Sequence, residues 1–334
     1  MDTERENGDP MVNALQSTRR PGQPAGADLE ARGENPAALT AFHRGLLGVR
    51  VALAAALLGG TVAAAPAAEL QPQTVAAWNR YVEATERRIA AELENGRPDR
   101  FFVRDFGDGA AEARREVLAG RIRIDRLETR DADGERIRVP KGAIHHWLGS
   151  ALIPDVTLEE VLHALIYAVE PKELQDDVIE SRVLARPADD RLELFLKLRR
   201  KQVVTVHFNS EHSAAYTRHR PGLASSRSVA TRIAELDGAG TPGEREKPVG
   251  RDRGFLWRLN TYWRYQQVDE GVIFELESIS LSRGIPRLLG WMVSPLINRT
   301  ARDVLTQTLA SMAEVLSARA PAGFGKPAAR ALQP

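Results

Sequence analysis

Two side chains able to take part in proton transfer, with an amide between them, occupy alternate positions near the middle of the chain. His207, Asn209 and Glu211 lie in a segment with strand-like alternation, so they share one face of that strand. The imidazole and the carboxylate are too far apart for a tight pair, yet both could do acid–base work if they faced a cavity. The alternative, which we favour, is that they lie on the outer, solvated face, where polar side chains are usually found.

The sequence shows few other signatures of catalysis or metal binding. It has no cysteine, and its 7 histidines show neither an HExxH motif nor paired helical spacing. His145 and His146 are neighbours on a predicted strand and point to opposite faces, so they cannot chelate one ion together. We find no GxSxG turn and no phosphate-binding loop. We therefore predict no metal and no cofactor and assign no catalytic residue, and an enzyme without these motifs stays an alternative.

Large aromatic rings are concentrated towards the C-terminus. Trp257, Trp263 and Tyr265 alternate along one predicted strand and should line the same face of it. Two interpretations stay open, because such rings build the wall of an apolar ligand cavity and also dominate ordinary cores. On the return strand, Ser278 and Ser280 are predicted to share the face of Trp263. Their hydroxyls could orient a polar head group, or could be satisfied beneath a helix.

These residues, with their apolar neighbours, form the predicted lining of a ligand site. The set is Trp147, Trp257, Leu259, Trp263, Tyr265, Leu276, Ser278, Ser280, Trp291, Leu305 and Met312.

A hairpin and a helix must position this lining. Residues 255–268 and 272–281 are rich in β-branched and aromatic residues and flank the turn Asp269-Glu270-Gly271, which predicts two long paired strands. Trp263 and Leu276 would share one face. The other would carry an exposed ladder of charge pairs, formed by Arg258, Arg264, Glu275 and Glu277. A helical stripe follows and should cover the apolar face; it contains Ala301, Val304, Leu305, Thr308, Met312, Val315 and Leu316.

The middle of the chain supplies the remaining strands. Five are predicted, at residues 143–153, 178–185, 191–199, 203–216 and 225–236. A helix opening on a capping box at Thr157 follows the first of them and ends at Pro171, with one short turn after it. No other strands are joined by a helix, so the sheet should be antiparallel. The polar loop 238–254 is predicted to be a lid or a disordered segment.

The N-terminal part has three regions of different character. Residues 1–41 are predicted to be disordered or an over-long start, with Met11 as an alternative start. Residues 42–68 are typical of a signal peptide cleaved after Ala64 or Ala68, and the alternative is an uncleaved membrane anchor. Residues 69–141 should form helices at 74–93 and 110–119 and a hairpin over 120–139. They are too short and too charged for a domain of their own, so we predict an extension packed on the main domain.

Charge gives no reason to expect a nucleic-acid partner. The chain carries 46 basic and 45 acidic side chains, and the part after residue 68 stays near neutrality. We predict a monomer for which membrane contact is compatible but not required. The signal segment predicts a periplasmic or secreted protein, and residues 319–334 a frayed tail.

Three segments resemble a known superfamily. They are Ile-Pro-Asp-Val-Thr-Leu-Glu-Glu-Val-Leu (153–162), Gly-Phe-Leu-Trp-Arg-Leu-Asn-Thr-Tyr-Trp-Arg-Tyr (254–265) and Glu-Leu-Glu-Ser-Ile-Ser-Leu-Ser-Arg-Gly-Ile-Pro (275–286). Their order resembles the START/polyketide-cyclase-like (SRPBCC) helix-grip superfamily, which includes the birch-pollen-allergen-like ligand carriers. The resemblance implies an α+β fold over residues 142–318, in which a curved antiparallel sheet of about seven strands wraps a long C-terminal helix. The signal segment and the extension depart from the simple pattern and put an intracellular role in doubt.

The resemblance also implies a function. In that superfamily a cavity between sheet and helix takes lipids, sterols, polyketides or other apolar molecules, and some members are cyclases or hydratases. We therefore expect a secreted or periplasmic protein that binds a hydrophobic small molecule or lipid. The alternatives are a cyclase- or hydratase-like enzyme with His207 or Glu211 as base, and an envelope-associated interaction module that docks through the helix bearing Trp78.

Overall fold

The computed structural model describes residues 68–201, 205–284 and 287–319, without the side chains of residues 287–298 and 300. The described residues belong to one compact unit. The predicted disordered start, the signal segment up to residue 67, the side chain of Trp291 and the tail from residue 320 lie outside the described part.

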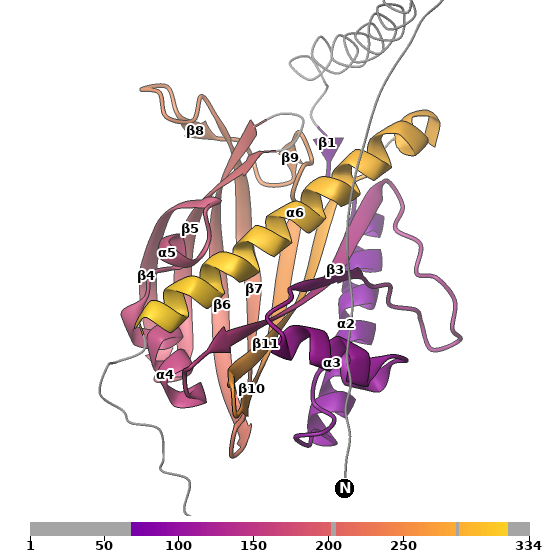
Figure 1. Cartoon of the computed structure of the whole chain (residues 1–334). Coiled ribbons are helices and arrows are strands. Elements are labelled where there is room, and N and C mark those ends of the chain that lie inside the picture. Colours follow the sequence, from indigo (N-terminus) through magenta and orange to yellow (C-terminus); the bar gives the residue numbers. More distant parts are fainter. Residues whose placement is uncertain (1–67, 202–204, 285–286, 320–334) are drawn as a thin grey trace, which may run out of the picture. The chain divides into compact units, whose positions relative to one another are not determined.

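The described elements are as follows, with the labels of Figure 1. The strands are β1 (Ala68–Glu69), β2 (Arg123–Arg126), β3 (Gly142–Pro154), β4 (Val178–Ala188), β5 (Arg191–Lys201), β6 (Thr205–Arg220), β7 (Leu223–Asp237), β8 (Arg245–Glu246), β9 (Arg251–Asp252), β10 (Arg258–Val268) and β11 (Gly271–Arg283). The helices are α2 (Pro72–Glu94), a 3₁₀ helix (Val103–Phe106), α3 (Ala110–Leu118), α4 (Leu158–His163), a π-helical turn (Ala164–Ala168), α5 (Pro171–Leu174) and α6 (Arg287–Arg319).

One large antiparallel sheet holds most of the strands. Its order is β2-β3-β11-β10-β7-β6-β5-β4, and β8 pairs with the end of β7. The seven predicted strands are present, and β2 and β8 add to them. Trp263 lies opposite Leu276 and Arg264 opposite Glu275, as the predicted hairpin requires. With α6 crossing one face of this sheet (Figure 1), the predicted α+β helix-grip architecture is confirmed.

Alternation along the strands gives the sheet two different faces. On β11, Phe274 and Leu276 pack in a core with Leu309 and Met312 of α6, and we call this side the inner face. The neighbouring residue Ile279 points the other way, into a core with aromatic side chains of α2, and we call this side the outer face. Figure 1 shows α6 in front of the sheet and α2 behind it. On β11, alternate residues therefore face different helices.

A glycine lets α6 approach the sheet closely. A Cβ atom added at Gly149 of β3 would lie 2.6 Å from Cδ1 of Leu309 and 3.0 Å from Cδ1 of Ile124. Leu309 is fully buried and belongs to the stripe that packs on β3, although the predicted stripe did not include it. The contact between Gly149 and Leu309 therefore sets how near the helix lies to β3.

Local signals in the sequence explain two chain reversals. The predicted capping box opens α4: the hydroxyl of Thr157 accepts from the backbone N–H of Glu160, and the Glu160 carboxylate accepts from the backbone N–H of Thr157. Gly271 follows the turn between β10 and β11 with φ at 142°. A Cβ there would lie 2.1 Å from the carbonyl oxygen of Ile153, so only glycine fits.

The predicted hairpin over residues 120–139 is wrong. β2 pairs with β3 at the edge of the large sheet, and the two flanks of the turn meet only at the bridge between Arg130 and Arg136. The reason is that their apolar side chains enter different cores. Ile124 is buried on the inner face, whereas Val139 packs with the outer-face cluster.

The N-terminal extension covers the outer face at β10 and β11. Trp78 and Tyr81 of α2 are buried against the sheet, so the apolar stripe of this helix is not free to dock a partner.

The loop 238–254, predicted as a lid or a disordered segment, instead contains β8 and β9, and β9 pairs with β1. None of the helices in the described ranges combines the length and apolarity that crossing a membrane requires.

Candidate ligand-binding site on the inner face

The strand register arranges inner-face residues in rows that run across the sheet. One row, from β6 to β3, consists of Tyr216, Ser226, Trp263, Leu276 and Gly149. The ring of Trp263 stacks with those of Tyr265 and Phe274, at centroid separations of 6.4 Å and 6.2 Å. These rings form a continuous aromatic surface at one end of the inner face.

The next row carries hydroxyl groups on three adjacent strands. From β6 to β3 it consists of Ala214, Ser228, Thr261, Ser278 and Trp147. Directly opposed residues in an antiparallel pair have Cβ atoms roughly 5 Å apart. Ser228, Thr261 and Ser278 therefore form an evenly spaced line, which we call the hydroxyl row.

The centre of the inner face is less buried than its ends. Ser228, Thr261, Trp263, Ser278 and Ser280 are half-buried, although they lie on central strands and on the face that α6 crosses. On either side of them the face is closed, and the side chains that close it include Phe274, Tyr265, Phe208 and Ser210. Part of each of the half-buried side chains therefore stays accessible to solvent over the middle of the inner face, between two well-packed clusters.

Three titratable groups of this face are neutral near pH 7. Burial raises the pKa of Tyr216 to about 12 and raises that of Tyr265 well above its usual value. Burial, with Arg200 nearby, lowers the pKa of His212 to about 4. The His212 ring is hydrogen-bonded to the hydroxyl of Ser210 at 3.0 Å. An apolar molecule in the accessible space would therefore meet neutral side chains at the centre of the face.

Most of the predicted lining residues come together on the inner face. One cluster includes Trp147, Trp263, Tyr265, Leu276, Leu305 and Met312. Leu259 packs against a second cluster, with Phe208 and Leu256. Ser278 and Ser280 share the face of Trp263, as predicted. Sequence reasoning missed Ser228 and Thr261, which strand alternation alone could have placed there.

The predicted position of Trp257 is wrong. It packs on the outer face with Trp78 and Tyr262, and its indole N–H donates to Asp252 at 3.1 Å. The alternation that relates Trp263 to Tyr265 does not extend to residue 257, because β10 begins only at Arg258. Trp257 therefore does not line the inner face.

The candidate bases His207 and Glu211 do not face the inner space. The inner-face residues of β6 are the even-numbered ones, such as Phe208 in the core. On the opposite face, the guanidinium of Arg232 lies 3.7 Å from the carboxylate of Glu211, and Asn209 donates to Glu246. The outer position that the sequence favoured is therefore the observed one, and neither residue can serve as a base for a ligand on the inner face.

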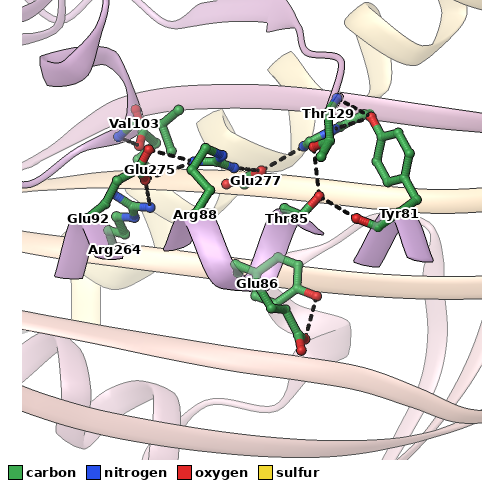
Figure 2. A network of polar contacts seen from close by, with 12 residues as sticks. Tyr81, Thr85, Glu86, Arg88, Glu92, Val103, Thr129, Arg264, Glu275 and Glu277 are labelled. Atoms are coloured by element: carbon green, nitrogen blue, oxygen red, sulfur yellow. Dashed lines mark hydrogen bonds and ion pairs between the residues drawn. The ribbon is translucent and has the colours of Figure 1, made fainter. Parts of the chain in front are cut away.

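The predicted ladder of exposed charge pairs is also wrong. Arg264, Glu275 and Glu277 are only 3%, 1% and 2% exposed, and Arg258 is half-buried. They lie on the outer face beneath α2, which supplies Arg88 and Glu92 as partners (Figure 2). The strand pattern shows which residues share a face, but it does not reveal that a helix from the extension covers that face.

Each buried carboxylate in this network has several donors. Glu275 accepts from the backbone N–H of Val103 at 2.6 Å and from the hydroxyl of Ser150 at 3.2 Å. Burial nevertheless raises its pKa to about 7, against the opposing effect of Arg264 and Arg104. Burial also acts to raise the pKa of Glu277, but bonds from His146 and Arg88 outweigh it and lower that pKa.

A hydrogen-bonded chain extends the network along α2. The hydroxyl of Tyr81 lies 2.9 Å from Nδ1 of His146, whose Nε2 lies 2.7 Å from Glu277. The Tyr81 hydroxyl also accepts from the backbone N–H of Thr129 (Figure 2). The side chains of Tyr81, His146 and Glu277 are all buried, so these hydrogen bonds fix α2 on the sheet.

Comparison with known families and with curated proteins finds no match. No model of a known protein family matches the chain. No curated protein matches it either.

Some solved structures of low sequence identity are similar to part of this chain. A STAR-related lipid transfer protein fragment from Xanthomonas axonopodis is 16% identical, with a TM-score of 0.38, over 57% of this chain and 98% of that one. The human StarD13 lipid transfer and protein localization domain is 7% identical, with a TM-score of 0.34, over 62% and 98%. The Zhui aromatase/cyclase from Streptomyces sp. R1128 is 10% identical, with a TM-score of 0.35, over 55% and 100%. Similarity at this level does not extend to ligand or activity.

Proposed function

We propose that this protein binds a hydrophobic small molecule or lipid in the space over the centre of the inner face. The observation that carries the proposal is the half-buried band on central strands beneath α6, with the ring of Trp263 beside it. In a filled core these positions would be as buried as Phe274 and Tyr265 in the adjoining row. An apolar guest would fill the remaining space and remove that surface from water.

The energetics of such binding follow from the area covered. Burying apolar surface contributes about 25 cal/mol for each Å². The neutral state of His212 and Tyr216 removes the cost of desolvating a charge beside the guest. The site as described therefore favours uncharged, largely apolar ligands.

The direct test of binding is to identify what the protein carries. Protein purified without detergent should release an apolar compound into organic solvent, detected by mass spectrometry. The apo protein should then enhance the fluorescence of N-phenyl-1-naphthylamine. Absence of both signals would contradict the proposal.

A substitution of Trp263 separates binding from folding. Trp263→Ala should weaken probe binding about tenfold or more, because the stacked ring is lost from the accessible space. Since Trp263 is only half-buried, we expect a smaller loss of unfolding free energy than for Tyr265→Ala in the closed cluster. Equal probe affinity in wild type and Trp263→Ala would place the ligand elsewhere.

Export is part of the proposal. The signal segment supports it, and β1 bears on the cleavage position, because Ala68 pairs with Asp252 and Glu69 with Arg251. Cleavage after Ala68 would remove half of β1, so we propose cleavage after Ala64. N-terminal sequencing of the exported protein should begin at Ala65. A protein that retains residues 42–64 would instead be anchored.

A further inference from the structure

We infer that the hydroxyl row, Ser228, Thr261 and Ser278, selects ligands that carry neutral oxygen atoms along one edge of an apolar skeleton. The inference rests on the proposed function, since it names the part of the same site that would distinguish one apolar guest from another. The ligand class is a hydroxylated or keto-bearing amphiphile with at least two oxygens on one side.

The free state of these hydroxyls is the first argument. Other inner-face hydroxyls are paired: Ser210 donates to the carbonyl of Leu196 at 3.1 Å, and Ser226 lies 3.4 Å from the hydroxyl of Tyr265. Among the side chains that the structure describes, which do not include those of residues 287–298 and 300 on α6, none is hydrogen-bonded to the hydroxyl row, and no backbone group of the described ranges is either. Half-buried hydroxyls without partners are available to a ligand, and a ligand that leaves them unpaired loses affinity.

The spacing is the second argument. The three residues lie on adjacent strands β7, β10 and β11, in direct register. Neighbouring strands are about 4.8 Å apart, so the hydroxyls recur at about that interval across the sheet. Two oxygens in a meta arrangement on an aromatic ring are separated on a similar scale. A flat ligand with its oxygen-bearing edge on the row could therefore engage two hydroxyls at once.

The surroundings decide the kind of oxygen. A Ser or Thr hydroxyl both donates and accepts, so the row can bind an alcohol or a ketone. Trp147 and Ala214 flank the three hydroxyls in register, and the rings of the Trp263 row lie alongside. The exposed Arg126 follows only beyond Trp147, on β2. The groups directly beside the hydroxyls are therefore neutral, and the geometry fits a neutral polar edge better than a carboxylate or a phosphate, which would need a cation next to the hydroxyls themselves.

The test compares two ligands that differ only in their oxygens. Naphthalene and 1,3-dihydroxynaphthalene would each displace N-phenyl-1-naphthylamine from the wild type and from Ser228→Ala/Thr261→Val/Ser278→Ala. Because each hydrogen bond contributes about 1 kcal/mol net, wild type should prefer the dihydroxy compound by roughly tenfold or more. The triple variant should lose that preference while binding naphthalene within about twofold of wild type.

The control is a pair of hydroxyls outside the site. Ser213→Ala/Thr231→Val changes residues bonded to Glu193 and to the Glu211 carbonyl, away from the inner face, and should keep the wild-type preference. Probe binding without any preference in wild type, or an unchanged preference in the triple variant, would overturn this inference and leave the proposed function standing. Failure of wild type to bind the probe would overturn both.

Discussion

At the scale of single residues, adjacent positions of β11 have opposite roles. Leu276 and Ser278 face α6 and the proposed ligand, whereas Glu275 and Glu277 face α2 and are held by arginines. The alternation was readable from the sequence: it predicted that Arg264 would meet Glu275 or Glu277 across the hairpin, and Glu275 is the residue found opposite it. The burial of these charges was not readable, because it depends on a helix that begins about 200 positions earlier in the chain.

The titration of Glu275 gives a prediction about pH. Burial raises its folded pKa from the usual 4.5 to about 7, so the folded protein holds this proton more tightly than the unfolded chain does. That contribution to stability is complete below about pH 4.5 and is lost as the pH rises through 7. Glu275→Gln removes the dependence; its amide oxygen can still accept from the Val103 N–H, and its amide nitrogen can donate to the Ser150 hydroxyl.

Chemical denaturation of both proteins at pH 5 and pH 8 checks this. From pH 5 to pH 8, the free energy of unfolding of wild type should fall relative to that of Glu275→Gln by on the order of 2–3 kcal/mol. Other titrating groups are common to both proteins and cancel in the difference. A difference that stays constant with pH would show that Glu275 is ionised throughout.

The buried ion pairs give a second prediction. Arg264→Met removes the buried arginine that pairs with Glu92 and donates to the Phe101 carbonyl, and breaking a buried pair costs roughly 3–5 kcal/mol of unfolding free energy. Arg87→Met is the matched control, because Arg87 and Glu83 form a pair on α2 whose side chains are 62% and 68% exposed. It should cost less than about 1 kcal/mol. Similar losses in the two variants would contradict the interlocking role assigned to the network.

At the scale of elements, the sequence predicted the pieces with strong local signals. The capping box at Thr157, the turn before Gly271 and the long hairpin are present as predicted. The sequence did not reveal which edge β2 would join or that Trp257 precedes the strand that carries Trp263. Both depend on which apolar cluster a side chain joins, and the members of each cluster come from distant parts of the chain. The hydroxyl row was also missed, because local patterns do not give the register between its strands.

The contact between α6 and β3 gives a prediction at this scale. Gly149→Ala should destabilise the fold by about 1–3 kcal/mol, because the new methyl would collide with Leu309. Leu309→Ala alone should cost about 2–5 kcal/mol by leaving a cavity. In the Leu309→Ala background, Gly149→Ala should be nearly neutral or stabilising, because the methyl enters that cavity. Additive losses in a double-mutant cycle would contradict the assigned contact.

At the scale of the whole molecule, the sheet lies between α2 and α6, which pack on it in different ways. On the outer face α2 is fixed by charges and aromatic rings, so the extension is part of the folded unit. On the inner face α6 packs tightly against β3 at Leu309, while the centre of the sheet keeps accessible surface. We propose that this difference between a closed face and an incompletely filled one gives the molecule its ligand site.

The measurement that tests this most directly is the position of a heavy-atom guest. Crystals grown with 1-bromonaphthalene would reveal the bromine by anomalous scattering. We predict a single strong peak over the inner face, in contact with Trp263 and the hydroxyl row. A peak on the outer face, or an inner face closed by side chains with no bromine present, would contradict the proposed function.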